Sequence, residues 1–300
     1  HFTFLMNGAE VALYFFDERC RSSTLKLLTR CKGALWVFVA IGGGLMYNDY
    51  ICLSEGLTVD RPILIQGALY SELCLFREKF TLIKENHVGD FIFFECTYKG
   101  RSVVISKTKM GEVMSAVATT LGIRTYDPVF IINQGTAGAS ARWLNINDIV
   151  IGESISYICQ LSTDENREND RTNPWKKEEY RTLDGETASY RADSGLISTL
   201  KGLSCLKREG IYFDTVGTGD IWTKDPDTVR KYNRENGMVC EAMECTGAYF
   251  AANTLGTPLV TLRVISNNEL IGHPYDPSTD ITAQRAVIDI LDELFEKNEL

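Results

Sequence analysis

Four short segments of the chain carry side chains that can move protons or hold hydroxyl groups. Glu72 closes the segment IQGALYSE, Thr136 lies in NQGTAG, Glu244 follows Met243, and Asn267 lies in RVISNN. Carboxylates can activate a water molecule or accept hydrogen bonds from a cis-diol, and an amide can bond to a ring nitrogen. Such a set suits the cleavage of a bond between a sugar and a base, in which positive charge develops on the sugar and electrons move onto the base.

Each segment also has a purely structural explanation. A glutamate in the first turn of a helix, such as Glu72 or Glu244, complements the helix dipole. The turn G-T-A-G around Thr136 permits tight backbone geometry and is not the dinucleotide-binding pattern G-x-G-x-x-G. Ser266 and Asn267 can cap the turn that follows them. The order and spacing of all four segments therefore carry more weight than any one of them.

The elements that must position these residues alternate between short apolar runs and segments with helical spacing. Strands are predicted at 62–66, 91–98, 101–107, 129–134, 148–152, 154–161, 211–217 and 259–265, and helices at 71–84, 110–121, 193–206, 226–235, 242–254 and 279–297. This alternation favours a mostly parallel sheet that is covered on both faces. We therefore expect an α/β fold, a three-layer α/β/α sandwich with a central mixed β-sheet, in which the four segments lie at carboxyl ends of strands.

The composition is that of a globular protein and excludes several classes of function. The 300 residues are 44% hydrophobic and 24% charged, and the net charge of −9 comes without a basic stripe, so we expect neither a nucleic-acid partner nor a membrane partner. Nine cysteines without a C-x-x-C pair predict reduced thiols in a cytoplasmic protein, and the three histidines are dispersed, so no metal site is expected. The polar stretch 162–190 predicts a long loop or insertion.

The first fifth of the chain differs from the rest. The apolar run 33–46 follows several basic residues, which is typical of a signal or anchor at 20–46, although it is shorter than the ~20 residues of a transmembrane helix. Three consecutive glycines stand just before Met46, as a translated ribosome-binding site would encode. We expect Met46 to be the native initiator, 1–45 to be a non-native or signal-like leader, and 46–300 to form one catalytic domain; a real extra domain at the start is the remaining possibility.

Several blocks, taken in order, resemble a known family. IQGALYSELCLFREKF, INQGTAGA, DIVIGE, TGDIW, AMECTGAYFAANTLGTPLV and RVISNNE are similar to the signature blocks of 5′-methylthioadenosine/S-adenosylhomocysteine nucleosidases, over roughly 61–297. The resemblance implies a nucleoside phosphorylase-like fold, hydrolysis of a purine nucleoside, and no cofactor. It also implies a homodimer paired near the 5′ end of the substrate, for which the predicted helix 110–121 and the aromatic residues Trp175 and Tyr180 offer surface.

The resemblance also implies a role for each candidate residue. Glu72 falls where the attacking water is activated, and Thr136 falls near that water and the sugar. A carboxylate can accept from both hydroxyls of a cis-diol, and an indole offers a broad stacking surface. Met243 and Glu244 match the ribose site of the family. Trp222 matches the aromatic residue that stacks on the purine, and Met110 matches an apolar contact near the sugar. Trp222 can equally be an aromatic of the core or of a lid.

Asn267 departs from the family pattern. The family usually has an aspartate there, which protonates N7 of the purine, whereas an amide can bond to N7 without delivering a proton. General acid catalysis contributes ~10²–10⁴-fold, so the difference matters. Three explanations stay open: the substrate is a 6-oxopurine nucleoside, as in futalosine hydrolases, which are similar in carrying asparagine there; Asn268 or Glu269 supplies the acid; or the protein binds nucleosides and scarcely cleaves them.

The nucleophile can be water or phosphate. Phosphorolysis needs a phosphate pocket, usually built from arginines and backbone donors. The arginines near the predicted sheet ends are Arg77, Arg124 and Arg263, of which Arg77 lies inside the first predicted helix, and no loop rich in glycine and arginine follows Gly67. We therefore favour water and keep a purine nucleoside phosphorylase as an alternative.

Overall fold

The computed structural model describes residues 2–6, 9–14, 24–31, 34–41, 53–54, 61–159, 161–163, 175–177 and 189–297, with side chains described for 61–159 and 190–297. The chain divides into two compact units, His1–Asp60 and Arg61–Leu300, and each has a sheet of its own. Among the described residues, no helix is both long enough and apolar enough to span a membrane.

The first unit contains an antiparallel sheet in the order β1-β2-β3-β4-β5. Its strands are β1 (Phe2–Met6), β2 (Ala9–Tyr14), β3 (Thr24–Cys31), β4 (Ala34–Ile41) and β5 (Leu53–Ser54). Strand β4 falls within the run predicted to be signal-like. Met46 and the three glycines before it lie outside the described residues, so the expectation about the native initiator stays a prediction.

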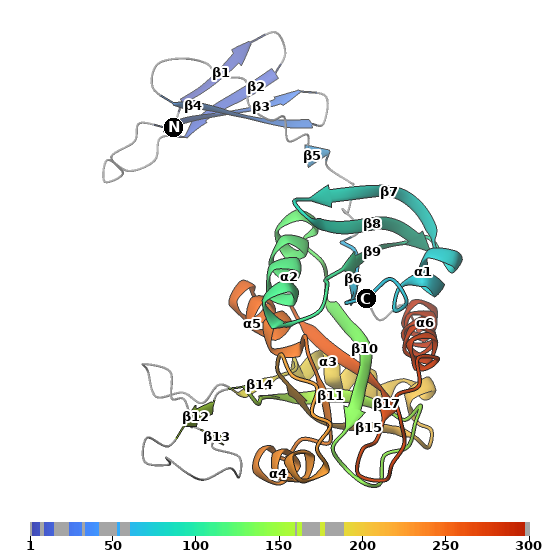
Figure 1. Cartoon of the computed structure of the whole chain (residues 1–300). Coiled ribbons are helices and arrows are strands. Elements are labelled where there is room, and N and C mark those ends of the chain that lie inside the picture. The colour runs from blue at the N-terminus through green and yellow to red at the C-terminus, as the bar shows by residue number, and fades with distance from the viewer. Residues whose placement is uncertain are drawn as a thin grey trace. The chain divides into compact units, whose positions relative to one another are not determined.

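The second unit is built on a ten-stranded mixed sheet, shown in Figure 1. Its strands are β6 (Ile63–Gly67), β7 (Thr81–Val88), β8 (Phe91–Tyr98), β9 (Arg101–Lys107), β10 (Ile131–Ala139), β11 (Ile149–Tyr157), β14 (Ser189–Arg191), β15 (Ile211–Thr218), β16 (Cys240–Ala242) and β17 (Leu259–Asn267). They run in the order β14-β11-β15-β16-β10-β6-β9-β8-β7, and β17 pairs with both β10 and β11. The pairings therefore close a ring of five strands, β10-β17-β11-β15-β16, beside the open part of the sheet.

Helices cover both faces of this sheet, which confirms the predicted three-layer α/β/α sandwich with a central mixed sheet (Figure 1). One core packs α2 (Glu112–Tyr126) and α5 (Cys245–Leu255) against the sheet, and the other packs α1 (Cys74–Lys79), α3 (Ser194–Gly202) and α6 (Thr279–Lys297). A short 3-10 helix, Ser204–Leu206, follows α3.

Helix α4 (Pro226–Asn236) shows how local sequence sets the helix ends. The side chain of Asp225 accepts a hydrogen bond from the backbone N–H of Thr228 at 2.8 Å, and Pro226 occupies the first helical position, where no N–H is needed. Gly237 ends the helix in the left-handed region at φ 64°. The helix predicted at 226–235 is confirmed.

Some predicted boundaries are wrong. The helix predicted at 71–84 ends at Lys79, because the chain becomes extended at Phe80 and continues as edge strand β7, whose pairing with β8 satisfies its backbone. Ile83 on β7 is exposed, so its helical spacing from Phe80 and Phe76 did not mark a buried face. The two strands predicted at 148–152 and 154–161 are one strand, β11.

Two further differences concern the site. Strand β10 runs through the glycines to Ala139 and does not end at 134, and the three-residue strand β16 lies where a helix was predicted to begin. Within the predicted loop 162–190, the described residues include strand β13 (Trp175–Lys177), which pairs with β12 (Leu161–Thr163).

Candidate active site

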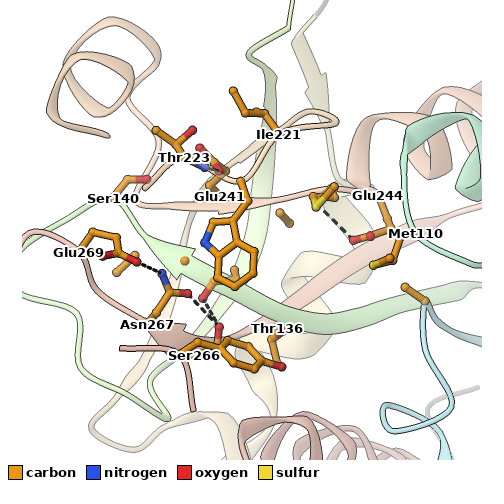
Figure 2. Close-up of a pocket in the computed structure, with 18 of the residues that line it drawn as sticks. Met110, Thr136, Ser140, Ile221, Thr223, Glu241, Glu244, Ser266, Asn267 and Glu269 are labelled. Carbon is orange, nitrogen blue, oxygen red and sulfur yellow. Dashed lines mark hydrogen bonds between the residues drawn. The ribbon is translucent and has the colours of Figure 1, made fainter. Parts of the chain in front are cut away.

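One cavity of the second unit collects all seven residues that the sequence singled out, and Figure 2 labels Met110, Thr136, Glu244 and Asn267 among them. They are Glu72, Met110, Thr136, Trp222, Met243, Glu244 and Asn267. The volume of about 270 Å³ is close to the lower end of the ~300–1,000 Å³ of small-molecule sites. The catalytic and binding roles assigned to these residues remain predictions.

Glu72 enters the cavity from the turn between β6 and α1. The backbone N–H groups of Ala68 and Leu69 donate to its Oε2 atom at 2.7 and 3.0 Å, and the N–H of Thr136 donates to Oε1 at 3.4 Å. A Cβ on Gly135 would lie 2.6 Å from Oε1, so only glycine lets the carboxyl approach strand β10 this closely. The carboxyl is thus held rigidly at the cavity wall.

The pKa of Glu72 is raised from its ordinary value of 4.5 to about 7. Burial is the main cause, and the nearby charge of Glu244 adds to it, while the Leu69 N–H and Arg263 act in the opposite direction. A carboxyl with a pKa near neutrality is well matched to take a proton from water at physiological pH.

Glu244 stands immediately before α5 and also lines the cavity. Its Oε2 accepts from the N–H of Met243 at 3.3 Å and lies 3.8 Å from the Nη2 atom of Arg263, which is 1% exposed. Burial raises the pKa of Glu244, and Arg263 partly offsets this rise. A carboxylate has acceptor capacity on both oxygens beyond these contacts, so Glu244 can accept from a pair of hydroxyls.

The large apolar side chains that are exposed at the cavity include Trp222 and Met110, which lie in segments that precede helices. Trp222 lies in the segment between β15 and α4, is 50% exposed, and meets Tyr275 edge-to-face with ring centroids 5.8 Å apart. The Nζ atom of Lys224 lies 4.6 Å from the centre of the Trp222 ring. Met110 is 58% exposed at the cavity. The indole is therefore not a core aromatic and is free to cover a flat ligand.

Asn267 ends strand β17 and is 3% exposed. Its Nδ2 atom donates to Oε1 of Glu269 at 3.3 Å, and its Oδ1 atom accepts from the hydroxyl of Ser266 at 3.1 Å (Figure 2). A Cβ on Gly138 would lie 3.3 Å from the amide, so this glycine also makes room for a site residue. The amide is fixed by two partners and faces the cavity.

Asn268, one of the two residues weighed as a substitute acid, is buried in the wall. Its Nδ2 atom donates to the carbonyls of Ala141 and Leu144 at 3.1 and 2.8 Å, and its Oδ1 atom accepts from Leu270 N–H at 3.1 Å. It does not line the cavity, whereas Glu269 does. Of the two, only Glu269 is placed to exchange a proton with a ligand.

Sequence reasoning missed Glu241 and Thr223, which also line the cavity. The N–H of Thr223 donates to Oε1 of Glu241 at 2.8 Å. Glu241 belongs to the short strand β16, which has no periodic signal of its own, and Thr223 gains significance only from its place next to Trp222. No pattern in the chain would have identified either residue.

A further buried carboxyl, outside the cavity, supports the site. Glu112, at the start of α2, accepts from the hydroxyl of Thr218 and from the N–H of Gly247 at 2.5 Å, which ties α2 to β15 and α5. Burial raises its pKa to about 7. The N–H of the preceding residue, Gly111, donates to Oε1 of Glu244 at 3.5 Å.

The ionisable side chains in the described lining of the cavity are acidic, apart from one tyrosine. The lining includes four carboxyl side chains, and none of the described residues that form it is lysine, arginine or histidine. The residues Arg77, Arg124 and Arg263 considered for phosphate binding do not line it. No group of three or more His, Cys, Asp or Glu residues in the described part of the chain is placed to hold a metal ion. This arrangement can polarise water and hold hydroxyls, and it disfavours an anion such as phosphate.

Comparisons with known proteins agree with this geometry. A family model described as the phosphorylase superfamily matches residues 62–296. The 5′-methylthioadenosine/S-adenosylhomocysteine nucleosidase of Bacillus subtilis is 30% identical over 203 residues, which cover 67% of this chain and 83% of the relative. The nucleosidase of the same description from Bacillus velezensis is 28% identical over 224 residues, 74% of this chain and 91% of the relative.

Solved structures show the same fold. The nucleosidase of Neisseria meningitidis in complex with methylthio-immucillin-A matches with a TM-score of 0.63 and 20% identity, over 77% of this chain and 98% of that one. The futalosine hydrolase of Helicobacter pylori matches with a TM-score of 0.66 and 18% identity, over 79% and 99%.

Proposed function

Because the chain belongs to the phosphorylase superfamily, we propose that its cavity hydrolyses the N-glycosidic bond of a purine nucleoside such as 5′-methylthioadenosine or S-adenosylhomocysteine. The observation that carries this proposal is the pairing of Glu72 and Glu244 in one cavity whose described lining holds no cation. The two Bacillus relatives, which are 28% and 30% identical over the matched residues, are nucleosidases, which supports the same class of reaction.

In this reaction Glu72 takes a proton from the attacking water, for which its pKa near 7 suits it. Glu244 accepts from the 2′ and 3′ hydroxyls and stabilises the sugar as it gains positive charge. Trp222 covers the base, Met110 and Met243 contact the sugar, and Thr136 lies near the water. Asn267 binds the leaving purine through its amide, so the base leaves with a hydrogen bond and without a proton from this residue.

The nucleophile is water and not phosphate. A phosphate in the cavity would meet four carboxyl side chains and no described cation of this chain. Arg263 is buried behind Glu244, where its guanidinium donates to Asn133. The lining therefore suits a neutral nucleophile that loses a proton to a carboxylate.

The test is product analysis with the whole chain. The protein is incubated with methylthioadenosine, adenosylhomocysteine, inosine and futalosine, with and without phosphate, and the sugar product is identified. We expect the free sugar in both conditions. Formation of a sugar 1-phosphate only when phosphate is present would refute hydrolysis, and no product from any nucleoside would favour a nucleoside-binding protein.

A second candidate, hydrolysis of a 6-oxopurine nucleoside, is favoured by Asn267. Its Nδ2 atom is a hydrogen-bond donor at the place where the resemblance leads one to expect an aspartate. A donor can approach both N7 and O6 of an oxopurine, which are acceptors. The inosine and futalosine arms of the same assay distinguish the two candidates.

We also propose a homodimer. Helix α2 exposes Val113, Met114 and Val117, and the neighbouring helix α5 exposes Phe250, so an apolar stripe continues from Met110 at the cavity. Exposed apolar stripes of this kind commonly form the interface between two copies of a chain. We expect light scattering to give a dimer, Val113→Lys to give a monomer, and the matched control Ile83→Lys on β7 to leave the dimer intact. A wild-type monomer at micromolar concentration would refute the pairing.

The catalytic domain is proposed to lie within 46–300, because every cavity residue falls between Ala68 and Tyr275. A chain that begins at Met46 is expected to keep full activity and the same melting temperature. The cytoplasm is the proposed compartment, since the six cysteines among the described side chains are free thiols. A loss of activity in the shortened chain would show that the first unit contributes to the site.

A further inference from the structure

Helix α5 begins directly after Glu244, the residue whose carboxyl is proposed to bind the ribose. Glu244 is the N-cap residue of this helix, yet its side chain accepts no capping hydrogen bond from the described backbone of the helix. The first N–H groups of a helix have no partner within the helix, and an N-cap side chain commonly accepts from one of them. The carboxyl of Glu244 faces the cavity instead, so other groups must cap α5.

Two side chains from outside α5 cap its first turn. The N–H of Cys245, the first helical residue, donates to Oγ1 of Thr218 at 3.2 Å. The N–H of Gly247 donates to Oε2 of Glu112 at 2.5 Å, and the hydroxyl of Thr218 donates to Oε1 of the same carboxyl. Thr218 ends β15 and Glu112 begins α2, so two other elements supply the cap. A carboxylate at this place also complements the positive end of the helix dipole.

Two glycines make this contact possible. A Cβ on Gly247 would overlap the carbonyl oxygen of Glu112, so only glycine lets the starts of α5 and α2 approach this closely. Gly111 has a φ of 98°, which favours glycine, and its N–H donates to Oε1 of Glu244 at 3.5 Å. The N–H of Glu112 donates to Oδ1 of Asp220 at 2.8 Å, which holds the first turn of α2. Glu112 is therefore anchored through its backbone and its side chain, and the residue before it contacts Glu244 directly.

Removing the Glu112 carboxyl would leave the N–H of Gly247 without its partner. Buried N–H groups are nearly always paired, and Gly247 is buried. Glu244 stands at the N-cap position, from which a side chain can reach the N–H of the third helical residue, Gly247. The carboxyl of Glu244 is thus the acceptor expected to turn toward α5. A carboxyl that caps its own helix has less acceptor capacity left for a diol in the cavity.

We propose that Glu112 is a positioning residue: by capping α5 in place of Glu244, it keeps the Glu244 carboxylate directed at the 2′ and 3′ hydroxyls of the ribose. The inference rests on the proposed function only in that Glu244 binds these hydroxyls. Glu112 does not line the cavity, so it acts through Glu244 and not on the substrate. Its loss should weaken recognition of the hydroxyls and leave the contacts with the base unchanged.

The experiment measures how strongly binding depends on the two hydroxyls. Adenosine and 2′,3′-dideoxyadenosine, and the corresponding inosine pair, are titrated by calorimetry at about pH 8. The parent protein is the full chain with Glu72→Gln, which is expected to bind nucleosides without cleaving them, and Glu112→Ala and Glu112→Gln are added to it. Asp193→Ala is the matched control, because Asp193 caps α3, none of whose described residues lines the cavity.

We expect the parent to bind its preferred nucleoside about 10- to 100-fold more tightly than the dideoxy counterpart, in line with a hydrogen bond to a charged group. Glu112→Ala should lower this ratio about tenfold. Glu112→Gln should keep most of it, since the amide oxygen can still accept from the N–H of Gly247. Asp193→Ala should lower the melting temperature, because a helix loses its cap, and leave the ratio unchanged.

An unchanged ratio in Glu112→Ala, or an equal loss in Asp193→Ala, would overturn the inference. Equal losses in Glu112→Ala and Glu112→Gln would also overturn it, because the charge and not the cap would then act on Glu244. If Glu112→Ala does not fold, Thr218→Val removes the hydroxyl that binds Glu112 and caps Cys245, and an unchanged ratio in that variant would be equally contrary.

The proposed function is tested separately by the same proteins. The expected ratios without cleavage of any nucleoside by wild type would refute the proposed hydrolase and leave the role of Glu112 standing. Nucleoside binding that does not depend on the hydroxyls in the parent would refute the role of Glu244 and with it that of Glu112. No binding of any nucleoside would refute both proposals.

Discussion

Replacing Glu72 with glutamine should inactivate the enzyme and make the stability of the variant, relative to wild type, increase with pH. In the proposed mechanism Glu72 is the general base that removes a proton from water, and an amide cannot act as a base. The loss of a general base costs ~10²–10⁴-fold in rate. Because Glu72 acts on the water and not on the nucleoside, we expect kcat to fall while KM changes little.

The stability effect follows from the pKa of about 7 against an ordinary value of 4.5. A raised pKa means that the native state favours the protonated carboxyl. The full stability is present below 4.5 and is lost as the pH rises through about 7. At ~1.4 kcal/mol per pKa unit, ionising this buried group costs the native state about 3 kcal/mol by pH 8. Glutamine does not ionise and avoids this cost.

The assay is urea unfolding of the whole chain, wild type and Glu72→Gln, at about pH 5 and pH 8. The NH2 group of a glutamine side chain cannot accept a hydrogen bond, whereas backbone N–H groups donate to both oxygens of Glu72, one of them from Thr136 to Oε1. The variant is therefore also expected to lose about 1–3 kcal/mol of stability at every pH. The informative quantity is therefore the change in the variant's relative stability between pH 5 and pH 8, about 2.5 kcal/mol in its favour.

Glu78→Gln, an exposed substitution on α1, is the matched control and should show no such change. A relative stability of Glu72→Gln that does not vary with pH would refute the assignment of a buried, neutral-pH carboxyl. An active Glu72→Gln enzyme would refute its role as the base.

Three further substitutions and one pH profile test the rest of the site. Glu244→Gln should raise KM and lower kcat together, because its hydrogen bonds to the ribose act in both ground state and transition state; steady-state kinetics would show this. Asn267→Asp should shift the ratio of inosine to adenosine cleavage toward adenosine, and an unchanged ratio would contradict contact with the base. Gly135→Ala would bring a Cβ to 2.6 Å from Glu72 Oε1 and should abolish activity while the chain still binds nucleoside. The wild-type kcat/KM should rise with pH through about 7 as Glu72 loses its proton, and a flat profile would exclude it as the base.

Much of the fold could be predicted from the sequence because the sheet strands are buried apolar runs separated by amphipathic helices. Strands such as β6 and β17, whose residues are all buried, leave an unmistakable pattern. Edge strand β7 could not be predicted, because its residues are mostly exposed and its existence depends on pairing with β8. Three-residue strand β16 is too short for any periodicity and is fixed by its neighbours β10 and β15.

The candidate site likewise contains residues that could be predicted from the sequence and residues that could not. Glu72 and Glu244 stand in ordered blocks that the sequence itself displays, and the structure brings them to one cavity. Glu241 becomes visible only through its cross-strand pairing with Gly138, which is a property of register and not of local sequence. The two glycines of β10 have a local reason as well, since a side chain at Gly135 would crowd Glu72 and one at Gly138 would crowd Asn267.

The excess of carboxyl groups in the cavity has a physical rationale that links stability to catalysis. Burial raises the pKa of Glu72, Glu241 and Glu244 alike, which means that each carboxylate destabilises the native state when it is ionised. The partial counter-charge comes from Arg263, which lies 3.8 Å from Glu244 and behind it. A neutral nucleoside does little to offset the cost of the ionised carboxylates. The positive charge that develops on its sugar in the transition state, in contrast, is attracted by them. Interactions that strengthen only in the transition state are the ones that accelerate a reaction. An enzyme that cleaves a glycosidic bond therefore gains rate from the electrostatic field that costs its fold stability.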